Sequence, residues 1–168
     1  MVCYRKATLE DLIRVWDYQM AQNPDESRNQ RWRDSFISRN LQKRAATYVA
    51  VYDGEPVGEV TLDYFADGYG NPALRPLLAD GTTTGYVTAL RIRKEYEGKG
   101  YMSRLMACME TGAKEMGFTH LTIGVEAAET RNIGIYLHWG YNQFITSEVD
   151  CGELVLFYQK TLISDINT

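Results

Sequence analysis

Residues 86–105 read YVTALRIRKEYEGKGYMSRL. The run from Tyr86 to Arg93 is rich in β-branched and aromatic residues, which predicts a central strand. Gly98-Lys99-Gly100 follows, and from Met102 apolar residues recur every three or four positions until Gly117, which predicts a helix. Glycines at a strand-to-helix turn let the backbone approach a phosphate, and the unpaired N–H groups of the first helical turn point outward. This stretch therefore predicts an anion site.

The preceding sequence predicts a strand at residues 4–7, two helices and a hairpin. Thr8, with Asp11 three residues later, opens a helix ending near Gln22, and apolar residues at helical spacing predict a second helix around residues 32–41. Asp53-Gly54 tolerates positive φ, so it predicts a tight turn between strands 46–52 and 56–64. Residues 65–84 form a connection longer than most, and we expect this segment to cover a site.

The sequence after Gly117 predicts a strand at 118–125, a helix at 130–139 capped by Thr130, and a closing hairpin of strands 141–147 and 153–160. The whole order is β-α-α-β-β-β-α-β-α-β-β. This order indicates an α/β (α+β) fold in which helices cover a mixed sheet. Because the chain has 168 residues and no internal repeat, we predict a single domain over residues 1–168.

Composition excludes several classes of protein. The chain is 45% hydrophobic and 24% charged, as in ordinary globular domains, and its net charge of −4 gives no general reason to expect nucleic acid as a partner. No run approaches the roughly 18 apolar residues of a membrane helix, and the N-terminus lacks a signal-peptide pattern, so we expect no membrane partner and a cytoplasmic location. Three widely separated cysteines indicate no metal site. A homodimer is the base-rate expectation.

Two familiar nucleotide motifs do not fit the glycine turn. A Walker A loop needs Ser or Thr after Lys99, where this chain has Gly100. A dinucleotide fingerprint needs a third glycine where Ser103 stands, and it opens a longer unit than the 68 residues that follow Gly100. A dinucleotide site and a glycine turn that binds nothing stay open as alternatives at this point.

Two stretches carry a resemblance to a known family. Residues 97–102, EGKGYM, fall on the motif Q/R-x-x-G-x-G/A, with Glu97 and Met102 differing from it, and residues 136–141, YLHWGY, fall on the later signature Tyr-x-x-x-Gly-Phe. The chain thereby resembles the GNAT family of N-acetyltransferases, with a likeness that extends over about residues 3–161. The resemblance implies a mainly antiparallel central sheet. It also implies acetyl-CoA as the acyl donor, no metal, and a small-molecule or peptide amine as the acceptor.

The resemblance also implies a set of binding residues. Main-chain groups of Leu90, Arg91 and Ile92 would bind the pantetheine arm, and Asn132 is a further candidate for that contact. The amine would approach from the opposite side, near the hairpin strands and residues 65–84. The pyrophosphate would lie on the glycine turn and the start of its helix, that is on Glu97, Gly98, Lys99, Gly100, Tyr101, Met102 and Ser103.

Amide formation from a thioester indicates which catalytic groups to seek. A lysine-like amine has a pKa of about 10.4, so a base or a water chain must remove its proton before it attacks, and the departing thiolate gains from a proton donor. Tyr136 matches the tyrosine that the family commonly uses as this general acid. Glu59 is our candidate base, with Glu126 as a similar alternative. A module that binds acyl-CoA or a nucleotide without turnover remains the competing hypothesis.

Overall fold

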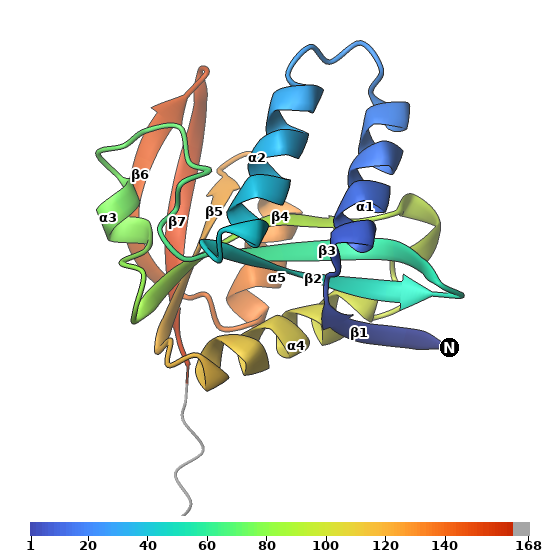
Figure 1. Ribbon diagram of the computed structural model, residues 1–168. Coiled ribbons are helices and arrows are strands. Elements are labelled where there is room, and N and C mark those ends of the chain that lie inside the picture. Colours follow the sequence, from blue (N-terminus) through green and yellow to red (C-terminus); the bar gives the residue numbers. More distant parts are fainter. Residues whose placement is uncertain (163–168) are drawn as a thin grey trace, which may run out of the picture. The chain divides into compact units, whose positions relative to one another are not determined.

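The computed structural model describes residues 1–162 (Figure 1), so residues 163–168 of the predicted domain lie outside the described part. The chain divides into two compact units, and the single domain stays a prediction. Unit 1 comprises residues 1–62 and 89–109, and unit 2 comprises residues 63–88 and the chain from residue 110 onward. Strand β4 and helix α4 each contribute residues to both units.

The elements follow one another in the predicted order, with a short helix and a 3-10 turn added. They are β1 (Val2–Lys6), α1 (Leu9–Gln22), α2 (Asn29–Leu41), β2 (Ala45–Tyr52), β3 (Glu55–Asp63), α3 (Arg75–Leu78), β4 (Thr84–Ile92), η1 (Lys94–Tyr96), α4 (Tyr101–Glu115), β5 (His120–Glu126), α5 (Thr130–His138), β6 (Gln143–Asp150) and β7 (Glu153–Thr161). The strand order is β1-β2-β3-β4-β5-β7-β6. Only β4 and β5 are parallel among the pairs with an assigned register, so the predicted mixed, mainly antiparallel sheet is confirmed.

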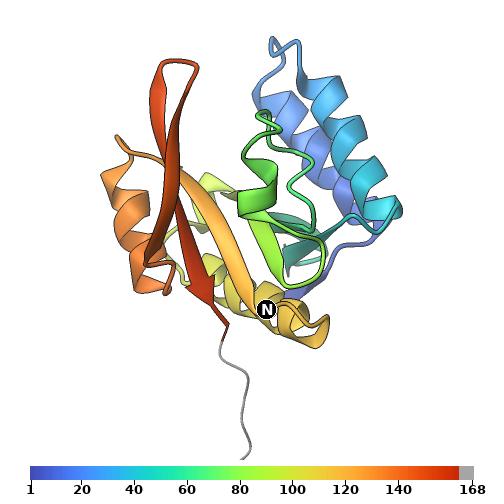
Figure 2. The same ribbon diagram turned by 90° about the vertical axis from the view of Figure 1, so that its left-hand side faces the viewer.

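In unit 1, α1 and α2 lie side by side as an antiparallel pair (Figures 1 and 2). Val15 of α1 packs against Val49 and Val51 of β2, and the rings of Trp16 and Phe36 lie 5.4 Å apart between the two helices. All of these side chains except Phe36 are buried, so α1 is fixed on the sheet by its apolar face. Tyr18 and Gln19, three and four residues after Val15, lie on the same side of α1 as Val15.

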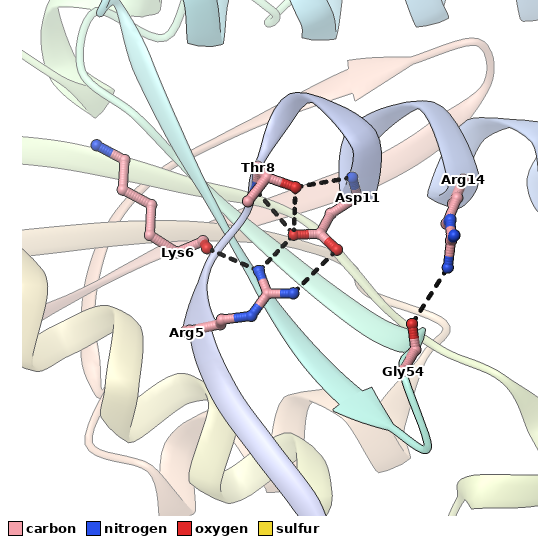
Figure 3. Close-up of polar contacts among 6 residues, drawn as sticks. All are labelled: Arg5, Lys6, Thr8, Asp11, Arg14 and Gly54. Carbon is pink, nitrogen blue, oxygen red and sulfur yellow. Dashed lines mark hydrogen bonds and ion pairs between the residues drawn. The ribbon is translucent and has the colours of Figure 1, made fainter.

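The start of α1 is held by the predicted capping box (Figure 3). The Thr8 hydroxyl accepts a hydrogen bond from the Asp11 N–H at 3.2 Å, and the Asp11 carboxylate accepts one from the Thr8 N–H at 2.8 Å. Arg5 of β1 pairs with the same carboxylate. Burial opposes ionisation of Asp11, but the hydrogen bonds from Arg5 and Thr8 outweigh it and lower the pKa of Asp11.

Replacing Thr8 with alanine is expected to destabilise the fold by about 1 kcal/mol, because it leaves an N–H at the helix start without its acceptor. For a chain of this size the melting temperature should fall by about 3 °C, which thermal denaturation followed by circular dichroism measures. Thr8→Ser is the control, since it keeps the hydroxyl and should retain most of the stability. An unchanged melting temperature in Thr8→Ala would show that the capping box contributes nothing.

In unit 2, β5, β7 and β6 form a continuous antiparallel ladder, and β6 and β7 extend as a long two-stranded ribbon (Figures 1 and 2). Phe157 of β7 is fully buried in a cluster with Tyr86 and Leu78. The closing hairpin is confirmed, but its predicted five-residue turn is wrong. The strands run on to Asp150 and from Glu153, and Cys151-Gly152, both at positive φ, make a two-residue turn.

The segment 65–84 contains α3 and is hydrogen bonded throughout its length. The Asp63 carboxylate accepts hydrogen bonds from the N–H groups of residues 67 and 68, and the Asp80 carboxylate accepts them from residues 82–84. Tyr69 donates to the carboxylate of Glu148 on β6, and Asn71 donates to it at 2.7 Å. Leu78 of α3 is fully buried. These contacts fix a segment that sequence patterns describe only as a long connection.

Two further local predictions have different outcomes. Asp53 and Gly54 have φ of 51° and 81°, which confirms the tight turn of the β2–β3 hairpin. The prediction that Thr130 caps α5 is wrong, because a capping residue lies just before the first residue of its helix. Glu129 occupies the capping position without a side-chain hydrogen bond, and Thr130 is the first helical residue.

Candidate active site

The end of β4 forms an open backbone edge in unit 1. The Arg93 N–H donates to the Val57 carbonyl of β3 at 2.9 Å, and the Arg91 carbonyl also faces β3 beside Gly58. Main-chain groups alternate in direction along a strand, so those of Leu90 and Ile92 face away from β3. Ala89 has a φ of 53°, a left-handed conformation that breaks the regular strand just before them. Leu90 and Ile92 thus offer the edge groups that the pantetheine prediction needs.

The loop after β4 presents main-chain donors to solvent. Gly98 and Gly100 have φ of 73° and 77°, and a side-chain carbon built on either would meet no atom within 4 Å. Helix α4 begins at Tyr101, directly after Gly100, which has no side chain with which to cap it. Within residues 1–162, the N–H groups of Gly100 to Ser103 donate no hydrogen bond, and the first helical bond comes from Arg104 at 3.3 Å.

Charge favours an anion at this helix start. The first turn of α4 contains no acidic residue, and its dipole presents partial positive charge. Lys99 is exposed and its ammonium lies 5.6 Å from the centre of the Tyr96 ring, while Glu97 and Ser103 are exposed beside it. Further along α4, Leu105, Met106 and Met109 are buried, so the apolar stripe anchors the helix as predicted, although Met116 is exposed. The N–H donors at the start of α4 therefore belong to a helix that is held in place by its buried side chains.

Glu59 lies on β3 and is almost fully buried, with 2% of its surface exposed. Its carboxylate accepts a hydrogen bond from Nε of Arg91 at 2.5 Å, and the Arg91 guanidinium also lies 5.0 Å from the centre of the Trp16 ring. Burial raises the pKa of Glu59, and the charge of Arg91 offsets part of that effect without cancelling it. A pKa shifted in this direction is one property of a general base that works near neutral pH.

A shallow pocket opens beside this pair in unit 1. Its walls are Val15, Tyr18 and Gln19 of α1, Pro56–Glu59 of β3, and Arg91–Arg93 at the end of β4. The Arg93 guanidinium lies 4.0 Å from the centre of the Tyr18 ring. The sequence alone did not indicate Tyr18 or Gln19 as site residues, and it indicated Arg93 only as a positive charge near the glycine turn. Alternate arginines at 91 and 93 on one strand, opposite Glu59 on another, are the signal that would have found them.

Tyr136 and Asn132 lie one turn apart on α5 in unit 2. The Tyr136 ring stacks on Trp139 with centroids 5.9 Å apart, and across the described residues its hydroxyl makes no hydrogen bond. Burial, and secondarily the charge of Glu129, raises the pKa of Tyr136. The Asn132 side chain donates to Glu129 at 3.1 Å. Glu126, the alternative base, ends β5 and is exposed.

The second signature has a structural cause. Gly140 has a φ of 97°, its N–H donates to the Leu137 carbonyl, and the Tyr141 N–H donates to the Tyr136 carbonyl, each at 3.0 Å. These two bonds form a Schellman motif, which requires a residue without strain at positive φ. Tyr141 is fully buried, so it anchors the end of α5. The Tyr-x-x-x-Gly-aromatic spacing therefore fixes the backbone of Tyr136.

Among the described residues, no three His, Cys, Asp or Glu side chains gather as metal ligands, and no helix is long and apolar enough to cross a membrane.

Comparison with known proteins assigns the family. The family model described as the acetyltransferase (GNAT) family matches residues 11–141, which include the glycine turn, Glu59 and Tyr136. The chain belongs to the GNAT family of acetyltransferases. None of the curated proteins matches the sequence significantly.

Solved structures share the fold at low sequence identity. A ribosomal-protein-alanine N-acetyltransferase from Brucella melitensis is 18% identical with a TM-score of 0.70, over 95% of this chain and 99% of that one. The paia N-acetyltransferase from Thermoplasma acidophilum, solved with coenzyme A, is 16% identical with a TM-score of 0.62, over 96% and 99%. A GNAT family acetyltransferase from Elizabethkingia anophelis, solved with acetyl-CoA, is 14% identical with a TM-score of 0.60, over 96% and 98%.

Proposed function

We propose that this protein transfers an acetyl group from acetyl-CoA to a primary amine. The observation that carries the proposal is the exposed start of α4, where four uncapped N–H groups follow a glycine turn in a chain of the GNAT family. Such a helix start binds phosphate oxygens. Two of the structurally similar proteins were solved with coenzyme A or acetyl-CoA, a donor whose diphosphate suits these groups.

The proposed reaction is a direct attack without an enzyme-bound intermediate. The neutral amine nitrogen adds to the thioester carbonyl, the carbon–sulfur bond breaks as the carbon–nitrogen bond forms, and the thiolate takes a proton. Glu59 accepts the amine proton, directly or through water, and Tyr136 donates the proton to sulfur. Main-chain groups of Leu90 and Ile92, with Asn132, bind the pantetheine arm, and residues 97–103 bind the diphosphate. The acceptor is a small molecule or a peptide amine.

The direct test measures acetyl-CoA binding by calorimetry and thiol release across a panel of primary amines. We expect binding, and turnover with at least one amine class. Binding without thiol release from any amine would identify the competing function, a module that senses acyl-CoA. Absence of acetyl-CoA binding would contradict both the acetyltransferase and the acyl-CoA-sensing module. The cytoplasmic location and the homodimer stay predictions.

A double variant of the glycine turn, Gly98→Ala with Gly100→Ala, is expected to weaken acetyl-CoA binding about 100-fold. Each alanine at positive φ costs about 1–2 kcal/mol. In the free protein the exposed turn relieves that strain by leaving the left-handed conformation. Binding of acetyl-CoA requires the turn to return to it, so the cost appears as weaker binding. Gly54→Ala is the matched control, because Gly54 has a φ of 81° with no atom within 4 Å and lies in the β2–β3 turn. Equal affinity in both variants would contradict the proposed diphosphate site.

A further inference from the structure

The pocket beside β4 contains a cation with few partners. Arg93 has 19% of its side chain exposed, stacks on the Tyr18 ring, and forms no side-chain hydrogen bond within the part of the chain that the structure describes. Its nearest acid is Glu55, 4.0 Å away and 54% exposed. Glu55 also pairs with Arg14 at 3.1 Å. Such an exposed, shared contact contributes little, so the N–H donors of Arg93 are largely unused.

The neighbouring arginine differs from Arg93. Arg91 is paired with the buried carboxylate of Glu59, so the two together carry no net charge. Arg93 therefore supplies the net positive charge of the pocket wall. No nitrogen of Arg93 is both buried and without a hydrogen-bond partner among residues 1–162, so its unused donors face solvent, and a ligand carboxylate would accept from two of them in a bidentate pair. Tyr18 and Gln19, whose side-chain polar groups make no hydrogen bond among residues 1–162, line the same pocket.

The arrangement of charges also orients a ligand. Side chains two residues apart on a strand point to one face about 6.6 Å apart, so Arg93 and the Glu59–Arg91 pair lie at different points of one wall. A molecule with its carboxylate on Arg93 would direct its amine toward the carboxylate of Glu59.

We infer that the acetyl acceptor is a small amino acid with a free carboxylate, which Arg93 binds while its amine faces Glu59. This inference rests on the proposed function and narrows its acceptor class. Arg93 acts as a specificity-determining residue, because it contacts a group of the substrate that does not react. Peptides amidated at the C-terminus, polyamines and other amines without a carboxylate lack the group that Arg93 binds, so they should be poor acceptors.

The test compares acids with their amides. Thiol release is measured with the twenty standard L-amino acids and with the carboxamide of each one that reacts, and rates are corrected for the fraction of neutral amine. In the wild type we expect kcat/KM for the acid to exceed that for its amide about 10- to 100-fold, the range of a charge-assisted hydrogen-bond pair. Arg93→Gln should abolish this preference by slowing the acid alone, and Arg93→Lys should retain part of it.

Arg14→Gln is the matched control, because it removes another arginine that contacts Glu55 but lies outside the pocket. It should keep the full preference for the acid. Equal rates with acid and amide in the wild type, or an equal loss with both in a folded Arg93→Gln protein, would overturn the inference. Amines without a carboxylate that react as fast as the amino acids, together with normal acetyl-CoA binding, would overturn the inference alone. Loss of acetyl-CoA binding and of all turnover would overturn the proposed function as well.

Discussion

Replacing Tyr136 with phenylalanine is expected to lower kcat about 1000-fold and to leave the Kd for acetyl-CoA nearly unchanged. Loss of a positioned proton donor typically costs between about 100- and 10,000-fold. The Tyr136 hydroxyl has no hydrogen-bond partner among the described residues, so its proton is free for the sulfur. Phenylalanine keeps the ring that stacks on Trp139, and the Schellman motif that fixes position 136 uses only main-chain groups. The variant should therefore fold normally.

The pH dependence separates a chemical role from a packing role. Because burial and Glu129 raise the pKa of Tyr136, its hydroxyl stays protonated to a higher pH than that of a free tyrosine. On the alkaline side, the rate should start to fall only near that raised pKa, and Glu129→Gln should move this alkaline limb to lower pH by removing a negative charge. Tyr158→Phe, on β7, is the control and should keep the wild-type rate. A folded Tyr136→Phe enzyme with unchanged kcat would exclude Tyr136 as the acid.

Several features set by a few adjacent residues were predicted correctly from the sequence, although the cap of α5 and the turn of the closing hairpin were not. The Thr8 capping box, the Asp53-Gly54 turn and the end of α5 at Gly140 each depend on the conformational preferences of one or two residues. The glycine turn before α4 belongs to this group, because Gly98 and Gly100 alone determine that a left-handed backbone precedes the helix. Such features need no knowledge of distant contacts, so the sequence predicted the turn at which we propose that the diphosphate binds.

Features set by distant residues were not predicted. The pairing of Glu59 with Arg91 and the stacking of Arg93 on Tyr18 arise because β3, β4 and α1 meet only after folding. Glu59 was predicted as the base from its place on a strand, without its partner. Helix α3 was missed for a similar reason. It has only four residues, and burial of Leu78 stabilises it rather than its own periodicity.

Replacing Glu59 with glutamine is expected to lower kcat/KM about 100-fold and to remove the acidic limb of the pH profile. A general base must be ionised, and the pKa of Glu59 is raised above its usual 4.5 by burial. Activity of the wild type should therefore fall as the pH drops through this raised pKa, at a higher pH than for an exposed glutamate. Glutamine has nearly the same shape but accepts no proton, so the limb should disappear.

Arg91 provides a second, independent variant for the same prediction. Its positive charge lowers the pKa of Glu59, opposing the larger effect of burial, so Arg91→Gln should raise that pKa and move the acidic limb to higher pH. The main-chain groups predicted to bind pantetheine are unchanged in this variant. If Glu59 serves only as the ion-pair partner of Arg91, the limb will stay in place in Arg91→Gln, and Glu59→Gln will lose stability without a change in the pH profile. Steady-state rates between pH 5 and 9, with circular dichroism on each variant, decide between these outcomes.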